Sequence, residues 1–279
     1  MDSKTVVMSV KNPKFAQALE ALSQADFSTA IGLLSEVVVE DAENSEAWMQ
    51  LGVCYLETRQ IDLGAEALTR AVQSGPQNAM AHYLLGNALG SLGNLERAAA
   101  CYRRALELEP QHAKAEEFLI KAESLLASRE HYRTGLRLLY SSSPGAAELN
   151  QALRELIQSM AIFPESPARE NLLECARKLY ALRTELPIPV RADRELDLWL
   201  VACKRGWHCL HASNWRGARE AYEEALSYRA DDAFVHHALG FSLAELGELD
   251  DALRVWLRVL ELNPGYDFTC FGYGGATPC

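Results

Sequence analysis

The stretch MAHYLLGNALGSLGNLERAAACYRRALELEP, residues 80–110, decides the fold of this 279-residue chain. Its spacing predicts two short amphipathic helices with a turn at Gly93-Asn94 between them, and Pro110 closes the unit. The same layout stands 34 residues upstream, in AWMQLGVCYLETRQIDLGAEALTRAVQSGP. A period of 34 residues with two helices in each unit is typical of a stacked helical array.

The positions shared by the two stretches follow the pattern W-x2-L-G-x2-Y, then A-x3-F, then P. The upstream unit places Trp48, Leu51, Gly52, Tyr55, Gly64, Leu68 and Pro76 there. The later unit has His82, Leu85, Gly86, Leu89, Ala98, Tyr102 and Pro110. In this the chain resembles the tetratricopeptide family. The resemblance implies an all-α, right-handed superhelical solenoid of antiparallel helix pairs.

Weaker copies of the unit extend in both directions. Residues 13–42 form a divergent first copy, and Gly206 and Tyr222 are matched 34 residues on by Gly240 and Trp256. The register of 113–194 stays open. Either HYRTGLRLLY, residues 131–140, is the second helix of a degenerate unit that begins with a helix over 113–129, or Ala152, Leu156, Ser159 and Pro164 end a repeat. Two further helices are expected at 146–162 and 167–185.

We therefore expect seven helix pairs in four segments. These segments are an N-terminal array over 1–128, an irregular middle with a Pro187/Pro189 connection over 129–194, a C-terminal pair over 195–265, and a flexible aromatic and glycine tail over 266–279.

The composition limits the class of partner. Hydrophobic residues make up 49% of the chain, enough for a continuous core, and the formal net charge is −11. An acidic chain repels phosphate backbones and anionic lipids, which disfavours nucleic acid or a membrane as the partner. No apolar run is long enough for direct membrane insertion, and the N-terminus lacks a signal peptide. Most of the seven cysteines fall in helical patterns, which favours buried free thiols and a cytoplasmic location.

The resemblance also implies which residues face a concave, peptide-binding groove on the first helix of each pair. These are Phe15, Leu19, Met49, Val53, Leu56, Tyr83, Asn87, Trp207, Leu210, His237 and Phe241. Their apolar character predicts an amphipathic helix or an extended apolar peptide as ligand. The carboxylate clamp of co-chaperones in this family needs Lys, Asn and Arg, and only Asn87 meets that requirement. The alternative is that these residues contact the next repeat or the chain's own tail.

No motif for catalysis or cofactor binding is found. The P-loop, the dinucleotide fingerprint, HExxH and GxSxG are all missing from the sequence. In CKRGWHCLH, residues 203–211, two cysteines and two histidines spread around one helix and do not converge on a metal. Cys270 and Cys279 bracket the tail and could close a redox-dependent loop. We expect no enzyme activity, no cofactor and no metal.

The expected function is that of a scaffold or adaptor for protein–protein interaction. A partner protein would place an apolar peptide or helix in the groove. One alternative is a self-assembling homo-oligomer in which the tail of one copy enters the groove of another. The other is a regulatory subunit of an enzyme complex, which the sequence does not separate from an adaptor.

Overall fold

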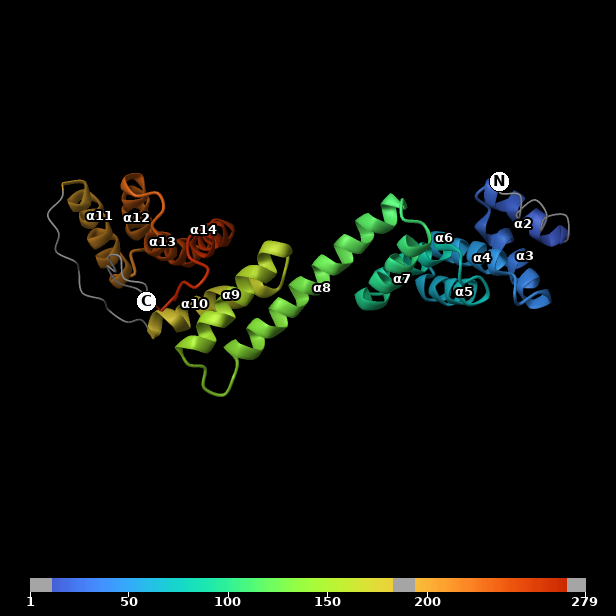
Figure 1. Cartoon of the computed structure of the whole chain (residues 1–279), viewed down its shortest axis with the longest axis horizontal. Coiled ribbons are helices and arrows are strands. Elements are labelled where there is room, and N and C mark those ends of the chain that lie inside the picture. Colours follow the sequence, from blue (N-terminus) through green and yellow to red (C-terminus); the bar gives the residue numbers. More distant parts are fainter. Residues whose placement is uncertain (1–11, 183–193, 270–279) are drawn as a thin grey trace. The chain divides into compact units, whose positions relative to one another are not determined.

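The computed structural model describes residues 12–182 and 194–269, and over these it holds thirteen α-helices and no strand (Figure 1). Their bounds are α2 Pro13–Ser23, α3 Phe27–Glu40, α4 Ser45–Glu57, α5 Ile61–Ser74, α6 Ala79–Ser91, α7 Leu95–Leu108, α8 Ala113–Leu139, α9 Ala146–Ile162, α10 Ala168–Ala181, α11 Arg194–His211, α12 Trp215–Tyr228, α13 Ala233–Glu245 and α14 Leu249–Leu262. The all-α solenoid class is confirmed. The predictions for the N-terminus, for Pro187/Pro189 and for Cys270 and Cys279 concern residues outside the described ranges.

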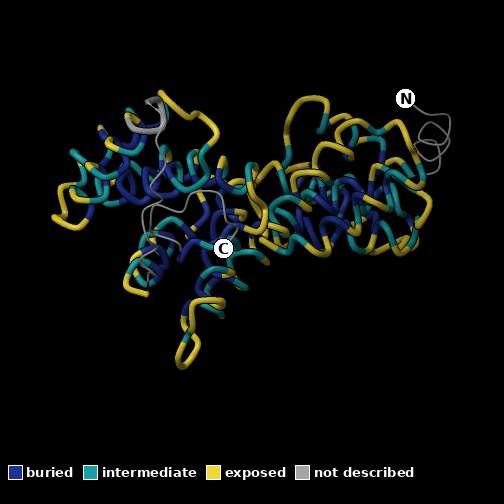
Figure 2. The backbone as a smooth tube through the Cα atoms, turned by 60° about the vertical axis from the view of Figure 1, so that its left-hand side comes forward, coloured by how far each residue is buried: buried dark blue, intermediate teal, exposed yellow. Residues whose placement is uncertain are grey.

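The chain divides into two compact units, Met1–Leu126 and Ala127–Cys279. Unit 1 contains the hairpins α2/α3, α4/α5 and α6/α7, followed by the first half of α8. Unit 2 contains the second half of α8, then α9 and α10, and the hairpins α11/α12 and α13/α14. Exposed residues gather at the turns, and buried residues line the inside of each hairpin (Figure 2).

In the hairpins α4/α5, α6/α7, α11/α12 and α13/α14, a glycine of the first helix packs against a large side chain of the second, whereas α2 contains no glycine. A Cβ built on Gly86 would lie 2.5 Å from the ring of Tyr102. The same crowding occurs between Gly52 and Leu68, between Gly206 and Tyr222, and between Gly240 and Trp256. Real Cβ atoms do not approach other atoms so closely, so only glycine lets the two helices cross at this distance.

The turns of the hairpins share one backbone feature. Gly93 has φ +76°, in the left-handed region, and the preceding helix ends there. The equivalent residues of the other hairpin turns also have positive φ: Ala25, Arg59, Ser213 and Gly247. Non-glycine residues adopt this conformation at a cost. The turn geometry is therefore common to the hairpins α2/α3, α4/α5, α6/α7, α11/α12 and α13/α14, whereas the residue at the positive-φ position differs.

The alternative in which 113–129 and 131–140 form separate helices is wrong, because α8 runs unbroken over Ala113–Leu139. No glycine, proline or turn residue interrupts ESLLASREHYR, residues 123–133, so no left-handed turn forms there. The second half of α8 pairs with α9 instead. A Cβ on Gly135 would lie 2.9 Å from Leu156, and the hydroxyl of Ser128 donates to the carbonyl of Ser159 at 3.0 Å.

The contact between Gly135 and Leu156 resolves the open register in favour of the second alternative. Ala152 precedes Leu156 by four residues, as Gly64 precedes Leu68 in the second helix of an earlier hairpin. The carbonyl oxygen of Ala152 lies 3.3 Å from the Cβ built on Gly135. Helix α10 packs against α9 and contacts α13, but no helix follows it in the described residues before α11. The expected seven pairs are thus six hairpins and one single helix over the described residues.

Candidate functional site

The groove residues expected in unit 1 differ in their exposure. Phe15 is fully buried in the core of the first two hairpins, and Met49 and Tyr83 are almost fully buried. Leu19, Val53, Leu56 and Asn87 are half-buried. The surface available to a ligand is therefore narrower than the apolar stripe in the sequence.

A hollow of about 420 Å³ opens beside Asn87, between α6, α7 and the first half of α8. We call it the α6–α8 pocket. Apolar side chains from α7 and α8 form most of its wall, and α6 contributes polar and glycine residues. The lining residues are Asn87, Gly90, Ser91, Leu95, Ala98, Tyr102, Phe118, Lys121, Ala122 and Leu125. Ala122 is buried against the hairpin, whereas Ile120, on the adjoining face of α8, is 59% exposed.

Aromatic rings support one wall of the α6–α8 pocket. The ring of Phe118 lies 5.9 Å from that of Tyr102 and 6.1 Å from that of Tyr83. Tyr83 also contacts His112, with ring centroids 4.7 Å apart. Clustered rings at these separations attract one another and restrict each other's rotation. Tyr83 therefore shapes the pocket from behind and does not itself line it.

Two polar groups at the pocket offer hydrogen-bond donors. The hydroxyl of Tyr102 donates to Asn87 Oδ1 at 2.9 Å, which orients the amide and leaves Asn87 Nδ2 with its N–H groups. Lys121 is exposed, and no acidic group among the described residues pairs with it. Burial raises the pKa of Tyr102 to about 12, so its hydroxyl keeps its proton. The pocket thus combines apolar walls with donors suited to a carbonyl or carboxylate.

In unit 2 the chain's own residues cover the expected groove. Leu210, His237 and Phe241 are buried, and Trp207 is half-buried against His211. The ring of Tyr180, from α10, stacks on Phe241 with centroids 4.8 Å apart. The sequence did not indicate this packing, because Tyr180 and Phe241 are far apart in the chain.

The end of the described chain also packs onto unit 2. Tyr266 and Phe268, expected in a flexible tail, are buried with their rings 5.4 Å and 5.0 Å from that of His237. They are ordered because two aromatic side chains bury apolar surface that α13 would otherwise expose. Unit 2 therefore fills its own groove, as the self-packing alternative expected for part of it.

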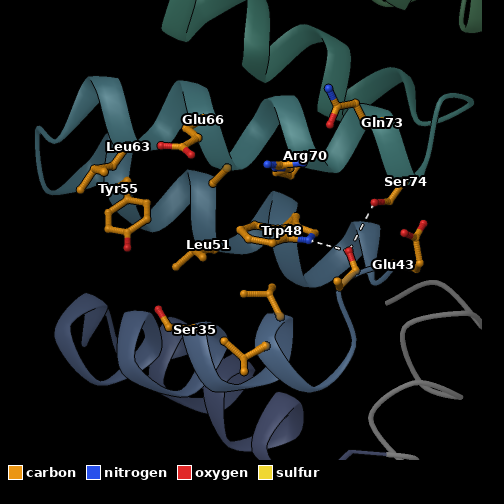
Figure 3. A pocket seen from close by; sticks show the side chains of 14 residues that line it. Ser35, Glu43, Trp48, Leu51, Tyr55, Leu63, Glu66, Arg70, Gln73 and Ser74 are labelled. Atoms are coloured by element: carbon orange, nitrogen blue, oxygen red, sulfur yellow. Dashed lines mark hydrogen bonds between the residues drawn. The ribbon is translucent and has the colours of Figure 1, made fainter.

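A second hollow, of about 680 Å³, lies between α3, α4 and α5 (Figure 3). The indole N–H of Trp48 donates to the carbonyl of Ala42 at 2.8 Å, which holds the ring in the wall. Glu43, Glu66 and Arg70 place both signs of charge around it. Sequence reasoning missed this hollow because it used Trp48 only as a position of the repeat pattern.

Other chemical sites were sought in the described residues. No group of three His, Cys, Asp or Glu side chains within 12–182 and 194–269 is placed to hold a metal ion. Cys54 and Cys175 are buried free thiols, and burial raises their pKa values to about 11 and about 12. At neutral pH both are protonated and poorly nucleophilic. Among the helices described, none is both long and apolar enough to cross a membrane.

These hairpins, which stack on one another within each unit and in most cases pack through a glycine, define an α-solenoid of the class that serves as a protein-interaction scaffold. The chain is a tetratricopeptide-repeat protein. Tetratricopeptide-repeat models match residues 15–79, 79–112 and 233–266. They identify the first three hairpins and the last, but not the middle of the chain.

Solved structures of several repeat proteins are similar to parts of this chain. The first tetratricopeptide domain of Spaghetti (RPAP3), bound to an HSP90 peptide, is 24% identical, with 46% of this chain and 97% of that one covered and a TM-score of 0.39. MamA is 17% identical over 88% of this chain and 94% of its own, with a TM-score of 0.34. The tetratricopeptide domain of P58(IPK) is 16% identical over 92% and 62%, with a TM-score of 0.46. A comparison with curated proteins found no match.

Proposed function

We propose that this protein is a non-catalytic adaptor that binds a partner protein through the α6–α8 pocket. The observation that carries the proposal is an apolar hollow of about 420 Å³ with donors from Asn87 and Lys121 beside it. Ligand sites are typically concave and apolar, with a few placed polar groups that set orientation. The groove position of Asn87, expected from the family resemblance, adds support.

The ligand is a peptide or amphipathic helix with one large apolar side chain that enters between Leu95, Phe118 and Leu125. Asn87 Nδ2 donates to a main-chain carbonyl of that ligand, and Lys121 binds a carboxylate on it. This ligand is consistent with the pocket because apolar burial supplies affinity and the donors supply direction. The half-buried Val53 extends the surface toward the first hairpins.

The test begins with peptides selected on the full chain from a random displayed library, followed by calorimetry on variants. Leu125→Glu should weaken the selected peptides at least about tenfold, because it places a carboxylate inside an apolar pocket. Asn87→Ala should weaken them severalfold, consistent with one hydrogen bond worth about 1 kcal/mol.

Ile120→Glu is the matched control, since it adds the same charge to the same helix at an exposed position outside the pocket. It should leave affinity unchanged. Selected peptides that bind Leu125→Glu as tightly as the wild type, with its helicity intact, would rule out the α6–α8 pocket as the binding site.

A further inference from the structure

The last described residues of the chain, 263–269, bind to unit 2 as a peptide ligand would. We call them the tail segment. They follow α14 and have turn and extended backbone, not helix. Tyr266 and Phe268 are buried, although they belong to a short segment with no regular structure of its own. Their partners lie on α9 and α13, more than 100 residues away for the α9 contacts.

Two side chains of α9 bind the main chain of the tail segment. The guanidinium of Arg154 donates to the carbonyl oxygens of Pro264 and Tyr266. Asn150 Oδ1 accepts from the backbone N–H of Phe268 at 2.6 Å, and Asn150 Nδ2 donates to the carboxylate of Asp267. Main-chain groups are present in every peptide, so contacts of this kind supply affinity for an extended peptide whatever its sequence.

Three side chains of the segment supply the specificity. Tyr266 and Phe268 contact His237 of α13 edge-on, and the tyrosine hydroxyl lies 3.3 Å from His237 Nδ1. The Arg154 guanidinium lies 5.9 Å from the centre of the Phe268 ring, within cation–π range. Between them, Asp267 accepts hydrogen bonds from Asn150 and from Thr269. The feature of the segment that unit 2 recognises is therefore an acidic residue between two aromatic residues.

The position of the segment explains why such a surface exists. Tyr266 lies two residues after Pro264, and His112 lies two residues after Pro110, so the two occupy equivalent places in the repeat. The ring of Tyr266 contacts His237 of α13. The ring of His112 contacts Tyr83, the equivalent residue of α6. In unit 1 the chain continues from His112 into α8, which covers the end of the third hairpin. After Tyr266 the described chain supplies only a short non-helical segment, with a turn at Phe268 and Thr269. The face of α13 that carries His237 is thus covered by residues that are not part of a helix.

We propose that the surface formed by Asn150, Arg154 and His237 is a second peptide-binding site, specific for an extended aromatic–Asp–aromatic segment of a partner protein. The chain's own tail segment occupies this site and competes with the partner. An occupant joined by a short connection has an effective concentration on the order of millimolar. A partner peptide therefore binds the wild-type chain weakly and binds tightly once the tail segment is weakened.

The test uses the full chain with Tyr266→Ser and Phe268→Ser together. A fluorescein-labelled peptide PGYDFT, the sequence of residues 264–269, is titrated and followed by anisotropy. The substituted chain should bind it at least about tenfold more tightly than the wild type, because the competing segment is lost. The peptide PGADAT, which lacks the aromatic rings, should not bind.

Two substitutions in α9 and one control locate the site. In the tail-substituted chain, Arg154→Ala and Asn150→Ala should each weaken the peptide about tenfold, because each removes two hydrogen bonds to it. Arg133→Ala, which removes an exposed arginine of the same unit that pairs with Glu130, should have no effect. Circular dichroism checks the helicity of each variant. If the double tail substitution lowers it, Phe268→Ala alone serves in the same titrations.

Three results would overturn the proposal. One is a folded tail variant that does not bind PGYDFT, and another is binding that Arg154→Ala and Asn150→Ala leave unchanged. The third is a wild-type dimer in light scattering that the tail substitutions dissociate, since that would place the tail of a second copy, not a partner, in the site. None of these results bears on the α6–α8 pocket in unit 1.

Discussion

At the residue scale, the glycines of the first helices allow the second helix of a hairpin to pack closely against them. Gly86 lies against Tyr102, whose ring is itself held by a hydrogen bond to Asn87. A ring fixed at both its edge and its hydroxyl cannot move aside for an added methyl group. By contrast, a Cβ on Gly32, in the middle of α3, would have no atom within 4 Å. The same substitution should therefore have opposite effects at the two positions.

Gly86→Ala should lower the free energy of unfolding by about 1–3 kcal/mol, the usual cost of overpacking a filled core. Gly32→Ala should raise it by up to about 1 kcal/mol, because alanine favours a helix interior and meets no neighbour there. Urea unfolding followed by circular dichroism measures both. Equal shifts of the same sign would show that crowding at Tyr102 does not control the hairpin.

At the element scale, the turn within each hairpin is defined by its backbone, and the sequence supplies glycine in only two of the five cases. Arg59 has φ +63°, where a side chain is strained, while the equivalent Gly93 is not. The helix that lacks such a turn, α8, continues through the place where a hairpin was expected. Turn residues therefore divide the chain into short helices, and their absence produces a long one.

Arg59→Gly should raise the free energy of unfolding by about 0.5–1 kcal/mol. Glycine relieves the strain of positive φ, and its greater freedom in the unfolded chain offsets part of the gain. Arg59→Ala is the control, since it removes the charge but keeps the Cβ, and it should change stability little. Thermal and urea unfolding of the two variants can be compared directly. A gain of equal size in both would assign the effect to the lost side chain.

At the scale of the whole molecule, unit 2 depends on contacts between distant parts of the sequence. Burial alone would raise the pKa of Asp267, but hydrogen bonds from Thr269 and Asn150 outweigh it and lower the pKa below its usual 3.8. A carboxyl group whose pKa is lowered on folding stabilises the folded state above its unfolded pKa. That stabilisation is lost as the pH falls through the folded pKa. Attachment of the tail segment should therefore weaken in acid.

Asp267→Asn should reduce the stability of the chain at pH 7, and the difference from the wild type should shrink toward zero as the pH falls below about 4. The reason is that protonation removes the same negative charge from the wild type that the substitution removes. Urea unfolding at pH 7, 5 and 3 measures the difference. A difference independent of pH would show that the charge of Asp267 does not stabilise the tail segment.

The two candidate binding sites differ in how far the sequence could predict them. Asn87 was expected in the groove because its place in the repeat is set by residues within 34 positions of it. The rest of the α6–α8 pocket depends on Phe118 and Leu125, which belong to a helix whose pairing was misassigned. Asn150 and Arg154 were not identified at all, because nothing near them in the chain indicates that they bind residues 264–268.

The sequence by itself determined the helices, the 34-residue hairpin and the glycine contacts, because each depends on spacing within one repeat and its neighbour. Helix periodicity, turn residues and the paired Gly86 and Tyr102 are all local signals. Only the tertiary structure decided that the second half of α8 pairs with α9 and that Tyr180 covers Phe241. The same holds for the binding of the tail segment to Arg154. These contacts join residues that the repeat does not relate, so their energies appear only when the chain has folded.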